Sequence, residues 1–143
     1  MTQSTMTGDS PHQTLHPSHW KPAIGYANGM AAEGRIVFTG GIIGWNADQE
    51  FECDDLVGQA AQALRSIVEV LACAGARPEH LVRLTWYVTD KREYLAGLKD
   101  LGRAYKEIIG RHYPAMALVQ VVALVEDRAK VEIEATAVIP DEG

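Results

Sequence analysis

Two glutamates near the end of the chain have a spacing that suits acid–base chemistry on a β-strand. Glu132 and Glu134 belong to the segment AKVEIEATAV, in which polar and apolar residues alternate. Residues two apart on a strand point to the same face, so both carboxylates lie opposite an apolar face. Carboxylates on a half-buried strand need partners or water. We interpret one of them, Glu132 before Glu134, as the candidate general acid or base, and a solvated or salt-bridged pair of glutamates is the alternative.

The segment YPAMALVQVVALV, residues 113–125, is unusually apolar. After Pro114 its only polar side chain is that of Gln120, and its valines favour a strand over residues 117–125. That strand places Leu118, Val122 and Leu124 on one face and Ala117, Val119, Val121 and Ala123 on the other. Leaving the first three in water forgoes roughly 1.5–3 kcal/mol each. We therefore expect another copy of the chain to cover this strand, with clefts between the subunits.

The rest of the chain supplies the elements that must position these groups. Strands are predicted at 26–32 and 35–40, joined by a hairpin turn at Glu33-Gly34, and at 80–90. An apolar stripe predicts a helix that begins at Asp54 or Asp55 and ends near residue 74. The spacing Asp90-x-x-Glu93 resembles a capping box and predicts a second helix over about 91–109. The last strands, 117–125 and 129–139, are expected as neighbours joined by a short turn.

This order, ββαβαββ, predicts an α+β fold with a mixed sheet and both helices on one face. Residues 23–143 form a single domain in this interpretation. Residues 1–22 are polar, contain three prolines and lack periodicity, which predicts a flexible N-terminal arm. We expect no metal site at His12, His16 and His19, because Pro17 interrupts the helix that would align them.

Composition and charge exclude several classes of function. The net charge of −6 and the pI of about 5.3 disfavour a nucleic-acid-binding protein, which needs a basic surface for phosphates. Cys53 and Cys73 are too few for a disulfide framework or a cysteine metal site. The sequence has neither a signal-peptide pattern nor an apolar run near 18 residues, so we expect a cytoplasmic protein without a membrane segment.

Five motifs, taken in their order along the chain, resemble the RidA family, also called YjgF/YER057c/UK114. They are GRIVFTGG, LACAGA, VRLTWYVTD, YPAMALVQV and AKVEIEATAV, and the resemblance extends over about residues 23–140. It implies a chorismate-mutase-like fold and a homotrimer with a central β-barrel and three clefts between subunits. It also implies hydrolysis of reactive enamines and imines to keto acids and ammonia, without a metal or cofactor.

The resemblance assigns roles residue by residue. Glu132 matches the glutamate that positions the attacking water, and Tyr26 matches a tyrosine early in the family pattern. Met116 replaces the arginine that grips the substrate carboxylate. Three further positions differ, since Leu118 replaces a cysteine, Gly40 a serine and Gly102 an asparagine. A thioether has no charge and no hydrogen to donate, so the chain resembles an atypical member that lacks the substrate-binding arginine.

Three functions are compatible with this pattern. The first is a RidA-like hydrolase or deaminase of a larger, more apolar enamine or imine. Its substrate contacts are expected from Tyr26, Gly41, Ile42, Trp45, Met116, Leu118 and His112, whereas Trp86 is interpreted as a core residue. His112 and Arg111 are the candidates for the missing positive charge, and a plain loop role, which we favour, is the alternative. The second is a non-catalytic, metabolite-binding or regulatory trimer of the same fold, and the third, a ribonuclease, is disfavoured by the acidic charge.

Overall fold

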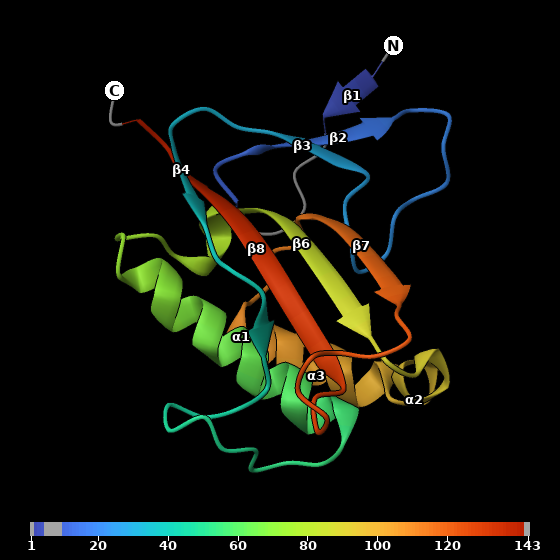
Figure 1. The fold of residues 1–143 in the computed structure, drawn as a ribbon. Coiled ribbons are helices and arrows are strands. Elements are labelled where there is room, and N and C mark those ends of the chain that lie inside the picture. The colour runs from blue at the N-terminus through green and yellow to red at the C-terminus, as the bar shows by residue number, and fades with distance from the viewer. Residues whose placement is uncertain (1, 5–9, 142–143) are drawn as a thin grey trace.

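A five-stranded mixed sheet forms the centre of the fold in the computed structural model, which describes residues 2–4 and 10–141 (Figure 1). Its strands are β4 (Arg35–Phe38), β5 (Ile42–Ile43), β6 (Leu81–Val88), β7 (Ala115–Gln120) and β8 (Val131–Ile139). The order is β4-β8-β6-β7, and β5 also pairs with β8. Only β6 and β7 run parallel; the other pairs are antiparallel. The predicted α+β class with a mixed sheet is confirmed.

Strand β8 lies between β4 and β6, so the expectation that the last two strands are neighbours is wrong. The apolar segment stops being a strand at Gln120, and a loop over 121–130 carries the chain from the β7 edge to the middle of the sheet. The alternation predicted for β8 is confirmed, because Val131, Ile133, Ala135 and Ala137 are all buried. A strand with one apolar face and neighbours on both sides has its backbone groups paired along two edges.

The predicted hairpin at Glu33-Gly34 is also wrong. Strand β3 (Gly29–Ala31) pairs with β2 (Gln13–Pro17), whereas β4 pairs with β8. Gly34 has φ of 144°, and a β-carbon at this position would overlap with the carbonyl oxygen of Ile139. Only glycine fits here, because the backbones of residues 34 and 139 pass so close to each other. The segment around Gly34 connects the small sheet to the main sheet and does not form a hairpin.

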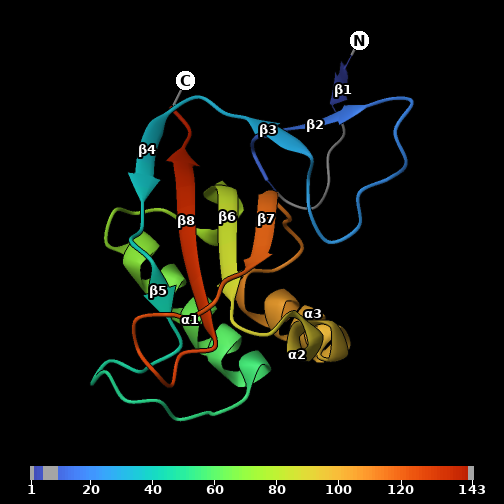
Figure 2. The same cartoon turned by 45° about the vertical axis from the view of Figure 1, so that its right-hand side comes forward.

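The helices cover one face of the main sheet, as Figures 1 and 2 show from two directions. Helix α1 (Leu56–Ala72) has Asp55 as its N-cap and packs on β8 and on α3. The second predicted helix is divided at Gly97 into α2 (Lys91–Ala96) and α3 (Leu98–Ile108). The short helix η1 (Pro78–His80) precedes β6. Among the described residues, no helix has the length and apolar run that crossing a membrane requires.

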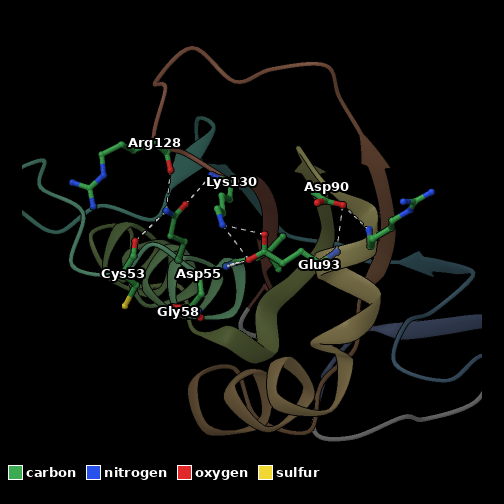
Figure 3. Close-up of polar contacts among 10 residues, drawn as sticks. Cys53, Asp55, Gly58, Asp90, Glu93, Arg128 and Lys130 are labelled. Carbon is green, nitrogen blue, oxygen red and sulfur yellow. Dashed lines mark hydrogen bonds and ion pairs between the residues drawn. The ribbon is translucent and has the colours of Figure 1, made fainter.

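The predicted capping box is only half formed. The Asp90 carboxylate accepts hydrogen bonds from the backbone N–H groups of Arg92, at 2.9 Å, and Glu93, at 3.4 Å, as an N-cap does (Figure 3). The Glu93 carboxylate, however, accepts the backbone N–H of Leu56 at 2.7 Å and pairs with Lys130 at 3.1 Å. Glu93 therefore joins α2 to the first turn of α1 and to the start of β8.

The predicted flexible arm does not fit residues 10–17. Ser10, His12 and Thr14 are buried, and β2 is the middle strand of a small antiparallel sheet with β1 (Thr2–Ser4) and β3. The His12 Nε2 atom lies 3.1 Å from the His80 carbonyl and 2.9 Å from that of Val138. These contacts fasten the segment to η1 and β8. The part of the prediction that concerns residues 1 and 5–9 lies outside the described residues.

His80 combines burial with a hydrogen bond that only its neutral form makes. Its side chain is 5% exposed, and its Nδ1 accepts the backbone N–H of Arg77 at 2.9 Å, which requires an unprotonated nitrogen. Burial lowers the pKa of His80 below its ordinary value of 6.5; Arg77 and His12 act in the same direction, and Glu79 opposes them. His80 is therefore protonated at a lower pH in the folded protein than in the unfolded chain.

We predict that the free energy of unfolding decreases as the pH falls below 6.5, because the unfolded imidazole then gains a proton before the folded one. The loss is complete only below the lowered pKa of His80. The measurement is urea unfolding at pH 7.5 and 5.5 at one protein concentration. His80→Asn, which keeps an acceptor but does not titrate, should lose less stability than wild type over this range, and the exposed control His19→Asn should behave as wild type. An equal loss in His80→Asn would contradict the assignment.

Candidate functional site

The alternation of side chains places the predicted site residues on opposite faces of the sheet. Along the β6–β7 pair, Met116 is opposite Leu84 and Leu118 is opposite Trp86, on the side that the helices cover. Along the β6–β8 pair, Glu132 is opposite Tyr87 and Glu134 is opposite Thr85, on the other side. One chain therefore separates its apolar site residues from its candidate acid–base residue.

The helix-covered side contains a cavity of about 820 Å³, here called the α3 cavity. It lies between α2 and α3, strands β6 and β7, and residues 24–26. Apolar and aromatic side chains line it, namely Ile24, Tyr26, Trp86, Tyr94, Leu98, Leu101, Tyr105, Tyr113, Met116 and Leu118. Lys99, Arg103 and Lys106 of α3 also line it. The structure thus brings together three of the predicted contacts, Tyr26, Met116 and Leu118.

Tyr26 reaches the cavity because its neighbour is fixed to the start of β7. The backbone N–H of Ala27 donates to the Pro114 carbonyl at 3.0 Å, and Ala27 forms an isolated parallel bridge with Ala115. This pairing sets Tyr26, which is about half exposed, beside the Pro-Ala-Met turn into β7. Sequence reasoning had no signal for this contact apart from the family resemblance.

The wall of the cavity behind β7 is built from neutral aromatic rings. Tyr105 and Tyr113 stack with ring centroids 5.3 Å apart, and the Tyr105 hydroxyl donates to the His112 carbonyl at 2.6 Å. Burial raises the pKa of Tyr105 far above its usual range and also raises the pKa of Tyr94. Both phenols therefore stay protonated near neutral pH, and neither can serve as a general base.

His112 does not fit its predicted role as a substrate contact. Its side chain is 1% exposed, and its Nε2 lies 2.6 Å from the Leu81 carbonyl. It is not among the residues that line the α3 cavity. The ring instead ties the loop before β7 to the start of β6, so it cannot supply the charge that Met116 lacks. Trp86, in contrast, belongs to the core, as expected, and also forms part of the cavity wall.

On the opposite side of the sheet, the two glutamates have different surroundings. The Tyr87 hydroxyl donates to Glu134 Oε1 at 2.6 Å, and this hydrogen bond is the main cause of a raised pKa of Tyr87. Within residues 10–141, no hydrogen bond or ion pair engages the carboxylate of Glu132. Glu132 is therefore the glutamate that remains available for chemistry.

Gly41 lies directly against the Glu132 carboxyl group. A β-carbon on Gly41 would overlap with Glu132 Oε2, so any other residue would displace that carboxylate. Strand β5 holds this arrangement, because Ile43 pairs with Glu132 and Ile42 pairs with Ile133. The predicted residues Gly41, Ile42 and Glu132 thus belong to one segment of the structure, separate from the α3 cavity.

Trp45 lies apart from both groups of residues. Its ring packs against Phe51 at a centroid distance of 5.9 Å, and the Arg128 guanidinium lies 5.3 Å from the Phe51 ring. Trp45 does not line the α3 cavity. Its contact with a ligand therefore stays a prediction, and within this chain its ring packs on Phe51 in the loop before α1.

Sequence reasoning missed the contribution of α2 and α3 to the cavity. Tyr94 and Leu98 were not proposed as contacts, and neither were the cations Lys99, Arg103 and Lys106. A signal was present, since these three cations are spaced by four and three residues, which places them on one stripe of a helix. The family resemblance pointed to this helix through Gly102, where the family has an asparagine, but it gave no role to the cations beside it.

Comparison with known proteins places this arrangement in a family. The family model described as Endoribonuclease L-PSP matches residues 17–139. Protein DfrA of Myxococcus xanthus is 35% identical over 133 residues, which cover 88% of this chain and 95% of that protein. The 2-iminobutanoate/2-iminopropanoate deaminase of Salmonella typhimurium is 28% identical over 130 residues, which cover 88% of this chain and 97% of the deaminase.

Solved structures agree with the sequence matches. YyfB from Yersinia pestis, a protein of the Rid family, superposes with a TM-score of 0.78 at 30% identity, covering 90% of this chain and 98% of that chain. TdcF from E. coli, solved with bound serine, has a TM-score of 0.65 at 30% identity and covers 82% of this chain and 91% of its own. The chain therefore belongs to the RidA (YjgF/YER057c/UK114) family, whose family model carries the description Endoribonuclease L-PSP.

Proposed function

We propose that the protein is a homotrimeric hydrolase that converts an enamine or imine to a carbonyl compound and ammonia. One observation carries the proposal: the unengaged carboxylate of Glu132 lies beside Gly41 on one face of the sheet, and the α3 cavity lies on the other. A substrate in the cavity can meet Glu132 only if the glutamate comes from a second chain. The name of the Salmonella relative, an iminobutanoate/iminopropanoate deaminase, supports the reaction class.

The surface that joins the subunits is the face of the sheet that carries Glu132, here called the open face. No helix covers it in the described part of the chain (Figure 2). Three apolar side chains on it are largely exposed: Phe38 at 71%, Ile36 at 57% and Val119 at 47%. Exposed aliphatic and aromatic surface of this extent favours association at roughly 25 cal/mol per Å² buried.

The residues first expected to drive this association are only partly the right ones. Leu118 faces the α3 cavity, and Val122 and Leu124 belong to the loop after β7, where Val122 is fully exposed. Phe38 and Ile36 on β4 take their place beside Val119. The exposed apolar residues of the open face, on both β4 and β7, therefore favour a covering subunit.

The proposed reaction is hydrolysis of a carbon–nitrogen double bond. Glu132 accepts a proton from a water molecule as the water oxygen attacks the imine carbon. The C=N electron pair moves to nitrogen, and Glu132 returns its proton to that nitrogen to give the carbinolamine. Glu132 then accepts the hydroxyl proton as the C=O bond forms, the C–N bond breaks, and the nitrogen takes this proton and leaves as ammonia. An enamine enters the same route after its β-carbon is protonated to give the imine. Placing the water is the main requirement, and no metal or cofactor enters the balance.

A non-catalytic metabolite-binding trimer is the alternative. Met116 favours it, because the methionine cannot form the charge-assisted hydrogen bonds to a carboxylate that are worth roughly 1.5–3 kcal/mol. Gly102, which lines the cavity in place of an asparagine side chain, removes another polar contact. The endoribonuclease in the family description is a weaker candidate, since the net charge of −6 opposes binding of a polyanion.

We predict that native mass spectrometry gives an assembly of three chains of 15.6 kDa each. Phe38→Asp places a charge on the open face and should shift most of the protein to monomer at about 10 µM, because burying an unpaired carboxylate costs several kcal/mol. Leu95→Asp, on an exposed position of α2, is the matched control and should remain trimeric. A monomeric wild type, or equal behaviour of the two variants, would contradict the proposed assembly.

We also predict that Glu132→Gln lowers the rate of ammonia release from freshly generated imines by about 10²–10³-fold, since the amide cannot accept the proton from water. Imines produced by an amino-acid oxidase serve as the substrate panel, and ammonia is measured with a coupled dehydrogenase. Glu134→Gln is the control, because its amide oxygen still accepts the Tyr87 hydroxyl, and it should keep most of the activity. Equal rates for wild type and Glu132→Gln would remove Glu132 from the mechanism.

A further inference from the structure

We propose that the α3 cavity binds an aromatic ligand that carries a carboxylate, and that lysines of α3 hold this carboxylate in place of the missing strand arginine. This ligand class rests on one part of the proposed function, namely that the α3 cavity is the substrate site. It combines the charge around the cavity, the shape of its walls and the nature of Met116.

The charge around the α3 cavity is unlike that of the protein as a whole. The chain has a net charge of −6, yet the described residues that line this cavity include three cations and no acid. Lys99, Arg103 and Lys106 occupy one stripe of α3, four and three residues apart. A single-sign set of charges beside an apolar cavity raises the local concentration of ligands of opposite sign. The cavity is therefore matched to an anion.

Two of these cations are not committed to another group. Arg103 pairs with Asp100 at 3.3 Å, and both side chains are exposed, so this contact is weak. Among the described residues, Lys99 and Lys106 take part in none of the ion pairs. Both ammonium groups can turn toward a ligand in the cavity without breaking an existing interaction. Lys99 and Lys106 are therefore the residues assigned to the carboxylate.

The walls of the cavity select the rest of the ligand. Tyr105 and Tyr113 present a stacked pair of rings, and Trp86 and Tyr94 add further aromatic surface. Met116 and Leu118 supply flexible apolar surface from β7, where a soft thioether also favours contact with rings. A small aliphatic acid leaves most of a cavity of about 820 Å³ unfilled, whereas a phenyl or indole ring fills more of it and stacks on its walls.

Moving the positive charge from the strand to the helix also explains why a methionine is compatible with an acidic ligand. A cation at position 116 would bind a small carboxylate on the β7 side of the cavity. With Met116 in that place, the β7 side instead accepts an apolar ring, and the carboxylate turns to the lysines of α3. The two ends of the ligand thus exchange places relative to the site that the arginine would build.

Three probes test the inference by calorimetry on the wild-type protein: phenylpyruvate, its methyl ester and pyruvate. Phenylpyruvate carries both the ring and the carboxylate, and it should bind at least about tenfold more tightly than either of the others. Its affinity should fall as salt rises from 20 to about 300 mM, because the contacts are partly exposed. Equal affinity for the ester would overturn the role of the anion, and equal affinity for pyruvate would overturn the role of the ring.

The double variant Lys99→Met/Lys106→Met locates the anion contact. It should weaken phenylpyruvate binding about tenfold and leave the ester unchanged. Lys91→Met/Arg92→Met makes the same change in net charge on α2, at positions that do not line the cavity, and should bind phenylpyruvate as wild type does. Native mass spectrometry and thermal unfolding confirm that both variants are folded. Equal losses in both variants, or none in either, would overturn the assignment to α3.

The outcome is separable from that of the proposed function. Selective phenylpyruvate binding without hydrolysis of the matching imine would uphold the ligand class and reject the hydrolase. Hydrolysis confined to imines that lack a carboxylate or a ring would uphold the hydrolase and reject the ligand class. Absence of binding by all three probes would reject the ligand class as well.

Discussion

The strict alternation of side chains along β8 is the constraint on which the rest of the structure depends. Every second residue of this central strand must face the core, so Glu132 and Glu134 must face away from it. Met116 and Leu118, on the neighbouring side of β6, fall on the core side of the same sheet. A site that uses both groups cannot be built within one chain. For the hydrolysis proposed above, assembly of two chains is therefore a requirement and not an addition.

The open face and the α3 cavity each contain only part of the proposed site. The open face has a carboxylate fixed beside Gly41 but no enclosure for a ligand. The α3 cavity has apolar walls and cations, but no carboxylate is among the described residues that line it, and burial raises the pKa of Tyr94 and Tyr105. Each lacks what the other supplies. In the proposed function, Met116 in place of the family's arginine on β7 changes which ligand the two surfaces recognise, whereas Glu132 keeps its position beside Gly41.

The hydrogen bonds around the start of α1 fix the register of β8 in the sheet. Glu93 contacts the first turn of α1 and also Lys130 (Figure 3). The buried Gln59 donates to the carbonyls of Cys53 and Arg128 and accepts the backbone N–H of Lys130. These bonds fix the loop that leads into β8. Because a shift of one residue in β8 would exchange its two faces, the position of Glu132 depends on this anchoring.

The sequence by itself determined helix α1, the strands β4, β6 and β8, and the faces that their side chains occupy, since these follow from local periodicity and capping. It did not determine β1, β2 and β5, the end of β7 at Gln120, or the break between α2 and α3 at Gly97. Strand alternation singled out Glu132 as the candidate acid–base residue, and the family resemblance added Met116 and Tyr26 as candidate contacts. Only the tertiary structure decided that β8 inserts between β4 and β6, that β3 pairs with β2, and that His112 is buried. It also decided that α3 borders the cavity with its cations. Strand order and helix docking depend on contacts between residues far apart in the chain, and a pattern with a period of two or 3.6 residues carries no information about them.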